Sequence, residues 1–287
     1  MKITFVGLGI MGSRMAANLL KTGVELTVFN RSSAPMETLA AQGAIAANSI
    51  GEAVKDADIV FSMLSTPQVV RDLFFGSEGA LAAMKSQALW ADCTTVNPSF
   101  SHEAATEARH FGIRFADTPV AGTKPQAQNA ELVFFAGGEE TDLKTLKPYL
   151  DAMGSKTIAL GMTGQGASFK MLVNIMLAQS MIIFSEAVLL GEKMGLDKDF
   201  LLNTLPNLAV AAPFTKFKAE MIRQDDYEVQ FPLEWMQKDL HLAALTAYEH
   251  QQPLYLANLA KELFAAASKQ GMTRLDFAAI HRYLENG

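Results

Sequence analysis

Cysteine is almost absent from this chain: Cys93 is the only one among 287 residues. A single cysteine excludes an intrachain disulfide and favours a reducing compartment, so we expect a cytoplasmic protein. Cys93 ends an apolar run, where a cysteine more often serves as a small buried side chain than as a nucleophile. The chain also opens directly into a strand-like run at residues 1–6, which leaves no room for a signal peptide and argues against export.

Runs of basic residues are missing as well. Because the formal net charge is -6 at pH 7 and the basic residues are scattered, we expect neither nucleic acid nor a membrane as a partner. A small anionic ligand could still bind at a local basic site. The most apolar window, residues 171–185, is interrupted by polar side chains and falls short of the roughly 18 apolar residues that a membrane span needs. We predict a buried helix there.

Histidine is scarce, and its positions match no metal site. The five histidines show none of the spacings that are typical of metal ligands, so we expect no bound metal. They are His102, His110, His241, His250 and His281.

The chain changes its pattern near Gly164. Before it, short apolar runs alternate with helical patterns, as in an α/β domain; after it, every segment has helical spacing and none alternates like a strand. A chain of this length is expected to form about two domains. We therefore predict an α/β domain over residues 1–163 and an all-helical domain over residues 164–287, joined by one long helix at 169–194.

A glycine motif follows the first predicted strand. It opens a helical pattern over residues 13–21, and a second strand at 24–29 completes a βαβ unit, the context that makes such a motif specific for a dinucleotide. The first glycine permits a tight turn, the second lets the backbone approach a pyrophosphate, and the third lets helix and strand pack closely. The alternative is a glycine-rich turn without a ligand. The motif consists of Gly7, Leu8, Gly9, Ile10, Met11 and Gly12.

The end of the second strand lacks the acidic residue that usually accepts a hydrogen bond from an NAD ribose. Asn30, Arg31 and Ser32 stand there instead. An acidic residue would repel a 2′-phosphate, whereas a guanidinium flanked by an amide and a hydroxyl can pair with it. We predict a preference for NADP(H) over NAD(H). The alternative is that Arg31 is a solvated surface charge.

Two further strands, at 58–64 and 88–93, end in polar loops. Loops at the carboxyl ends of such strands contact the ligand in doubly wound sheets, so Met63, Leu64, Ser65 and Thr95 are predicted cofactor contacts. Some of the hydroxyl residues in these loops could instead cap the helices that follow. The segment 121–131 between two later strands is long for a compact domain, which favours a binding role.

Lys170 and Asn174 are four residues apart at the start of the long predicted helix and therefore share one face of it. On so apolar a helix these polar groups need either water or a cleft, because burying an unpaired ammonium costs several kcal/mol. We favour the cleft. In the alternative, Lys170 lies at a wet helix end and Asn174 bonds to a neighbouring loop.

Together these residues resemble the β-hydroxyacid dehydrogenase family over essentially the whole chain, with glyoxylate and succinic semialdehyde reductases as the closest subgroup. The resemblance implies a Rossmann domain followed by an all-helical substrate and oligomerisation domain. It further implies that Lys170 is the acid/base, that Asn174 assists it, and that Lys238 contacts both cofactor and substrate. The motifs that carry it are the glycine loop, Asp117 to Gly122, Gly164 and Gly166 with Lys170 and Asn174, and Lys238 to Leu240.

The remaining substrate contacts implied by the resemblance fall on Phe231, Asp239 and a loop that departs from the family pattern. Where the family usually has Ser-Gly-Gly, this chain has Ala121, Gly122 and Thr123, and two later glycines are Gln126 and Ala130. A carboxylate-binding hydroxyl is lost at Ala121. The amides of Gly122 and Thr123, with the Thr123 hydroxyl, are the remaining candidates for holding a carboxylate.

The function expected from the resemblance is reversible, metal-free hydride transfer between NADP(H) and a small aldehyde or keto acid. Three alternatives stay open: a reductase of imines or other carbonyl compounds with a changed pocket, a phosphosugar-acid dehydrogenase, and a non-catalytic dinucleotide-binding relative. Imine reductases of this fold and the non-catalytic relatives usually lack the lysine, which counts against both. The apolar long helix also predicts a homodimer or homotetramer, since its faces must be covered.

Overall fold

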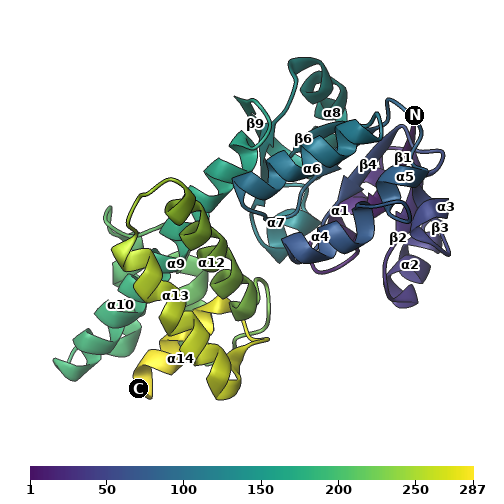
Figure 1. Cartoon of the computed structure of the whole chain (residues 1–287). Helices are drawn as coiled ribbons and strands as arrows, with labels where there is room; N and C mark the ends of the chain where they lie inside the picture. Colours follow the sequence, from purple (N-terminus) through teal and green to yellow (C-terminus); the bar gives the residue numbers. More distant parts are fainter. The chain divides into compact units, whose positions relative to one another are not determined.

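The computed structural model describes residues 1–287 and divides into two compact units, Met1–Lys170 and Met171–Gly287 (Figure 1). The first unit is a sheet with helices on both faces, and the second is built from helices. The predicted α/β domain followed by an all-helical domain is therefore confirmed. The two units meet inside the long helix α9 (Gln165–Lys193), which begins in the first unit and continues into the second.

The sheet of the first unit has the strand order β3-β2-β1-β4-β5-β6-β8-β7, with β9 paired to β8. The first six strands in this order, from β3 at the edge to β6, are all parallel. Strand β8 is antiparallel to β6 and β7, and β9 is parallel to β8. Because β1 lies between β2 and β4, the order of strands reverses there, and ligands bind at such a switch point. The strands are β1 (Lys2–Val6), β2 (Glu25–Phe29), β3 (Ile45–Ala46), β4 (Ile59–Ser62), β5 (Leu89–Asp92), β6 (Arg114–Asp117), β7 (Val120–Ala121), β8 (Leu132–Gly137) and β9 (Gly154–Gly161).

Alternate residues of the central strands point to opposite faces of the sheet, and both faces are buried. On β1, Phe5 joins the apolar cluster under α1 and α8, whereas Val6 joins the cluster under α3, α4 and α6. On β5, Leu89 and Trp90 divide in the same way. Burial on both faces explains why these strands read as continuous apolar runs.

The helices of the first unit include several that the sequence pattern did not indicate, namely α2, α3, α5 and α7. Each is eight residues or shorter, too short to show a helical period clearly. One of them, α7, lies within the segment 121–131 that was predicted as a long loop. The helices are α1 (Gly12–Leu20), α2 (Ser33–Ala40), α3 (Ile50–Val54), α4 (Pro67–Phe74), α5 (Ala80–Ala83), α6 (Pro98–His110), α7 (Lys124–Gln128) and α8 (Glu140–Met153).

The second unit encloses a main apolar core, in which Phe264 and Phe277 are fully buried, and a small cluster of Met171, Leu242 and Ala243. A buried ion pair lies beside the main core: the Lys218 Nζ is 2.7 Å from Asp276 Oδ1 and lies over the Phe277 ring, 4.6 Å from its centroid. Besides short 3-10 and π turns, its helices after α9 are α10 (Lys198–Thr204), α11 (Thr215–Gln224), α12 (Leu233–Glu249), α13 (Tyr255–Ala267) and α14 (Ile280–Glu285).

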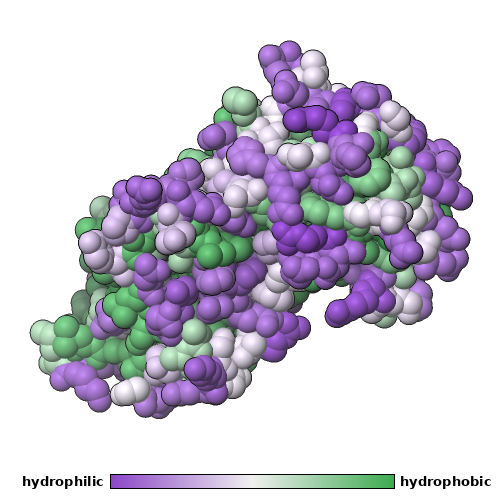
Figure 2. Space-filling view, viewed as in Figure 1, coloured by the Kyte–Doolittle hydropathy of each residue, from purple (hydrophilic) through white to green (hydrophobic).

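Helix α9 is less buried than predicted. Its length and composition would suffice for a membrane span, as they do for many core helices of globular proteins, and 39% of its most apolar window is buried. Four large apolar side chains on it are more than half exposed. They are Leu172, Met176, Ile183 and Leu190, and Figure 2 shows apolar surface over the helical unit.

Candidate active site

The glycine loop after β1 has the close packing that its motif requires. Gly7 has a φ of 93°, and a Cβ placed on it would lie 2.4 Å from the carbonyl oxygen of Met63. A Cβ on Gly12 would lie 2.0 Å from the carbonyl oxygen of Gly7. Gly9 differs, because it is exposed and a Cβ there would meet no atom within 4 Å. Two glycines thus serve packing, and Gly9 leaves the backbone open to a ligand at the start of α1.

Asn30 ties the end of β2 to this loop. Its Oδ1 accepts a hydrogen bond from the Leu8 N–H at 3.0 Å, and its Nδ2 donates to the Ser32 hydroxyl at 2.9 Å. The neighbouring Arg31 is exposed, and the first turn of α2 contains no acidic residue. The structure therefore gives Asn30 a positioning role, and Arg31 follows it in the chain as an exposed basic residue. A second guanidinium, that of Arg14, donates a hydrogen bond to the Ile10 carbonyl oxygen of the loop at 2.6 Å.

The loops after β4 and β5 are joined by a buried polar network. Asp92 Oδ1 accepts hydrogen bonds from the Ser62 hydroxyl at 2.7 Å and the Thr94 N–H at 3.1 Å, and the Thr94 hydroxyl accepts one from the Leu64 N–H at 3.0 Å. Burial raises the pKa of Asp92 to about 6. The network fixes the segments that carry the predicted cofactor contacts Met63, Leu64, Ser65 and Thr95. Of the possible helix caps in these loops, the Thr66 hydroxyl does cap α4.

Asp117 holds the start of the helix that carries the predicted acid/base. Its two carboxylate oxygens accept hydrogen bonds from the N–H groups of Gly164 and Ala167, both at 2.7 Å. Burial raises the pKa of Asp117 to about 6, although these hydrogen bonds oppose the shift. The contacts satisfy amides that the first turn of a helix leaves without partners. The sequence did not show this role, since the partners are far apart along the chain.

The start of α9 has room only for a glycine at position 166. A Cβ on Gly166 would lie 2.3 Å from the carbonyl oxygen of Phe135 and 2.8 Å from Asp117 Oδ2. The first turn of α9 therefore packs directly against β8 and the Asp117 carboxylate. Lys170 follows one turn later, so the packing at Gly166 sets its position.

Lys170 and Asn174 are both buried on α9, with 7% and 1% of their surface exposed. In the second unit, Asn174 Nδ2 donates a hydrogen bond to Asp239 Oδ2 at 2.6 Å, and the other oxygen of Asp239 lies 2.8 Å from Lys238 Nζ. Asn174 Oδ1 is buried and has no hydrogen-bond partner. Because the amide group is anchored through its nitrogen, its oxygen is left facing away from Asp239 as a hydrogen-bond acceptor.

The structure brings three predicted site residues together, Asn174, Lys238 and Asp239, and holds Phe231 by other contacts. The Phe231 N–H donates to Asp276 Oδ2 at 3.1 Å, and its ring lies 5.6 Å from that of Phe277. Phe231 is thus fixed by the same carboxylate that pairs with Lys218.

In the segment predicted to bind a substrate carboxylate, the two donors of Thr123 are hydrogen-bonded within the segment. The Thr123 N–H and hydroxyl both donate to Gln126 Oε1, at 2.9 and 3.0 Å, as part of a capping box at the start of α7. Ala121 pairs with Val133 in the sheet, and Gly122 is exposed with a φ of 122°. Thr123 followed three residues later by Gln126 is a capping-box signature that the sequence already contained.

Comparisons with known proteins agree along the whole chain. A sequence model described as the NAD binding domain of 6-phosphogluconate dehydrogenase matches residues 2–161. A second one, described as NAD-binding of NADP-dependent 3-hydroxyisobutyrate dehydrogenase, matches residues 164–284. The chain belongs to the β-hydroxyacid dehydrogenase family.

Relatives in this dehydrogenase family have differing substrates. Glyoxylate/succinic semialdehyde reductase 2 of Arabidopsis thaliana is 34% identical, with 97% of this chain and 78% of that protein covered. An NAD-dependent L-serine dehydrogenase of Pseudomonas aeruginosa is 33% identical, covering 99% and 98%. The solved Mycobacterium tuberculosis 3-hydroxyisobutyrate dehydrogenase with L-serine is 30% identical, covers 99% and 98%, and superposes with a TM-score of 0.89.

Membership in the β-hydroxyacid dehydrogenase family makes this chain an oxidoreductase that uses a nicotinamide dinucleotide and acts on a CH–OH group. The first unit fits that cofactor, because Gly9 faces open space at the helix start where a pyrophosphate is held in such domains. The relatives act on small hydroxy acids or the corresponding carbonyl compounds.

Proposed function

We propose that this protein catalyses reversible hydride transfer between NADP(H) and a small aldehyde or keto acid, with Lys170 as the acid/base. The observation that supports this most directly is the arrangement on α9. Lys170 is buried one turn before Asn174, whose Nδ2 is anchored by Asp239 and whose Oδ1 is left as a buried acceptor. A buried, oriented acceptor of this kind serves a substrate hydroxyl or the lysine ammonium better than it serves the fold.

Lys170 supplies both things that carbonyl reduction needs besides hydride. Its ammonium stabilises the negative charge that develops on the carbonyl oxygen, and it donates the proton that completes the alcohol. In the reverse direction the neutral amine accepts the hydroxyl proton. Its burial excludes water, which strengthens the electrostatic interaction with the reacting oxygen.

The nicotinamide cofactor, when bound, supplies or accepts the hydride. The open backbone at Gly9 would receive the pyrophosphate, and Arg31, with Ser32, would pair with a 2′-phosphate. No acidic residue stands at the end of β2 to repel that phosphate. These features favour NADP(H), and comparing KM for NADPH and NADH tests the preference.

Two substrate types compete. Acidic aldehydes of the glyoxylate and succinic semialdehyde type are suggested by the A. thaliana relative. Neutral carbonyl compounds or imines are favoured by one observation, since the Thr123 donors that a carboxylate would use are bonded to Gln126.

The test is NADPH oxidation by the purified protein across a panel containing glyoxylate, succinic semialdehyde, methylmalonate semialdehyde, a neutral aldehyde and a cyclic imine. Turnover of the acidic aldehydes would support the first substrate type. Turnover of the neutral compounds alone would select the second. Tight NADPH binding without any turnover would contradict the proposed function and indicate a non-catalytic dinucleotide-binding protein.

We further propose a homodimer or homotetramer in the cytoplasm. The assembly is suggested by the apolar side chains that α9 leaves exposed. The cytoplasm is suggested by the low number of cysteines, since Cys93 is the only one. Burial raises the pKa of the Cys93 thiol to about 12, so Cys93 is not a reactive thiol.

A further inference from the structure

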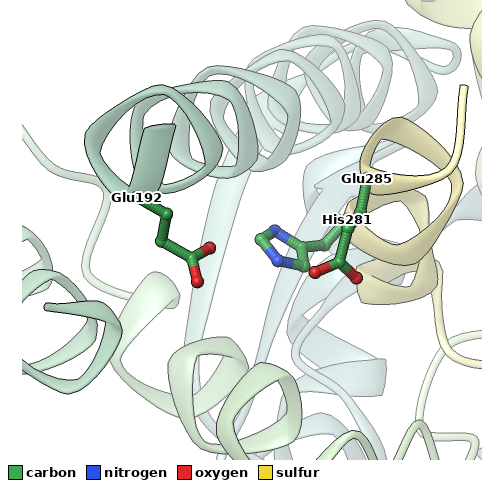
Figure 3. A group of neighbouring side chains, drawn as sticks. All are labelled: Glu192, His281 and Glu285. Carbon is green, nitrogen blue, oxygen red and sulfur yellow. The ribbon is translucent and has the colours of Figure 1, made fainter. Parts of the chain in front are cut away.

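A second cluster of ionisable side chains lies in the helical unit, at the far end of α9 from Lys170. Glu192 is near the end of α9, and His281 and Glu285 are four residues apart on α14 (Figure 3). Glu192 and Lys170 are about 33 Å apart along the helix, at 1.5 Å per residue. The cluster is therefore separate from the proposed catalytic residues.

His281 is the member that the fold does not explain. It is 1% exposed, yet neither ring nitrogen has a hydrogen-bond partner. Figure 3 shows its imidazole ring between the carboxylate groups of Glu192 and Glu285. A buried imidazole normally makes at least one hydrogen bond or metal bond, because leaving a buried polar atom unpaired costs about 1–3 kcal/mol.

The spacing of the three groups suits a bound cation. One ring nitrogen of His281 and one oxygen from each of Glu192 and Glu285 lie within 4.8 Å of one another. Ligand atoms that surround a zinc-sized ion at about 2.0–2.2 Å are themselves about 3–4 Å apart, so a small side-chain movement closes the site. The carboxylate side chains are 28% and 45% exposed, which gives an ion a route from solvent.

The charged neighbour of the cluster, Lys198, does not replace such an ion. Its Nζ is 4.0 Å from Glu192 and 3.8 Å from Glu285, beyond normal hydrogen-bond distance. An ammonium can balance carboxylate charge, but it leaves the imidazole acceptor unpaired. Its side chain is 36% exposed and is free to turn toward solvent when another cation enters.

We propose that Glu192, His281 and Glu285 form a binding site for a first-row divalent transition-metal ion, which links the end of α9 to α14. An imidazole with two carboxylates selects such ions, Zn²⁺ among them, over Mg²⁺ or Ca²⁺, which prefer oxygen ligands alone. We assign the site a structural role. The histidine spacing in the sequence predicts no metal because the proposed ligands come from distant parts of the chain.

The test uses the full-length protein, treated with EDTA and titrated with Zn²⁺ by calorimetry, with Tm recorded in parallel. We expect one Zn²⁺ per chain and a rise in Tm of about 5 °C at a hundredfold excess over Kd. His281→Gln and Glu285→Gln should each weaken binding by at least about tenfold. Lys198→Met should strengthen it several-fold, because a competing positive charge is removed.

A matched control separates this site from adventitious binding at surface histidines. His250→Gln removes an exposed histidine on the same unit and should leave the Zn²⁺ affinity unchanged. The proposal fails if Zn²⁺, Co²⁺ and Mn²⁺ show no one-to-one binding, or if binding survives both His281→Gln and Glu285→Gln. Because Glu285 is exposed, Glu285→Gln tests the site even if His281→Gln does not fold.

Discussion

Gln126 lies in the segment that we expect to bind the substrate, at a position where we expect a glycine in the family. Its carboxamide oxygen accepts hydrogen bonds from the backbone and hydroxyl of Thr123. An oxygen of a substrate carboxylate would use the same donors. The glycine that the family usually has at this position could not compete for them.

We predict that Gln126→Ala raises kcat/KM for acidic aldehydes relative to neutral ones by about tenfold, since one freed donor pair is worth about 1–2 kcal/mol. The comparison is the ratio of kcat/KM for succinic semialdehyde to that for a neutral aldehyde of similar length. Gln128→Ala, on the exposed side of the same helix, is the matched control. An unchanged ratio would mean that Thr123 does not contact the carboxylate.

Arg31 is the residue to which we attribute the proposed preference for NADP(H). We predict that Arg31→Gln raises KM for NADPH by about ten- to a hundredfold and changes KM for NADH by less than about twofold, because a charge-assisted pair is lost only with the phosphate. Steady-state kinetics with both cofactors checks this. An equal rise in KM for NADPH and NADH would mean that Arg31 contacts a part that both dinucleotides share. No change in either KM would mean that Arg31 is a solvated surface charge.

At the level of secondary structure, the packing of the first turn of α9 determines where Lys170 lies. Asp117 caps it, and Gly166 allows it to lie against β8. Contacts with β6 and β8 thus fix this turn, and they thereby fix the position of Lys170 one turn later.

Gly166→Ala is predicted to lower the free energy of unfolding by about 1–3 kcal/mol, because the added methyl group would overlap the Phe135 carbonyl oxygen. It should also lower kcat by displacing Lys170. Chemical denaturation and steady-state kinetics measure the two effects. Gly51→Ala is the control, since its Cβ would meet its nearest atom at 3.8 Å and should leave stability unchanged or slightly raised.

The sequence predicted the elements with strong local patterns well and missed the short helices α2, α3, α5 and α7. The glycine loop, the buried strands and α9 have strong local patterns, so their positions followed from periodicity and glycine placement. Asp117 as a helix cap, the link between Asn174 and Asp239, and the cluster around His281 join residues far apart in the chain. Such contacts depend on the tertiary fold, which no local pattern reveals. The capping box at Thr123 is an exception, because its residues are close in the sequence, yet the length of the segment predicts a loop where the structure has α7.

The whole molecule presents an apolar stripe along α9 that its own chain leaves exposed. Leu172, Met176, Ile183 and Leu190 repeat at intervals that place them on one side of the helix. A contiguous apolar surface of this kind usually marks a contact with another chain.

We predict that the wild-type protein has the mass of a dimer or tetramer at micromolar concentration, and that Ile183→Glu shifts it toward the monomer, because a carboxylate is buried at the contact. Light scattering after size-exclusion chromatography measures the mass. Tyr248→Glu, on an exposed position of α12, is the control. A monomeric wild-type protein would contradict the prediction.

Lys170→Ala tests whether Lys170 is the acid/base of the proposed reaction. The variant is compared with wild type and with the exposed control Lys216→Ala for NADPH affinity, Tm and kcat/KM on the best substrate of the panel. We predict unchanged NADPH affinity and a loss in kcat of about 10²–10⁴-fold, the usual contribution of a general acid. Retention of most of the wild-type kcat by Lys170→Ala would contradict this prediction.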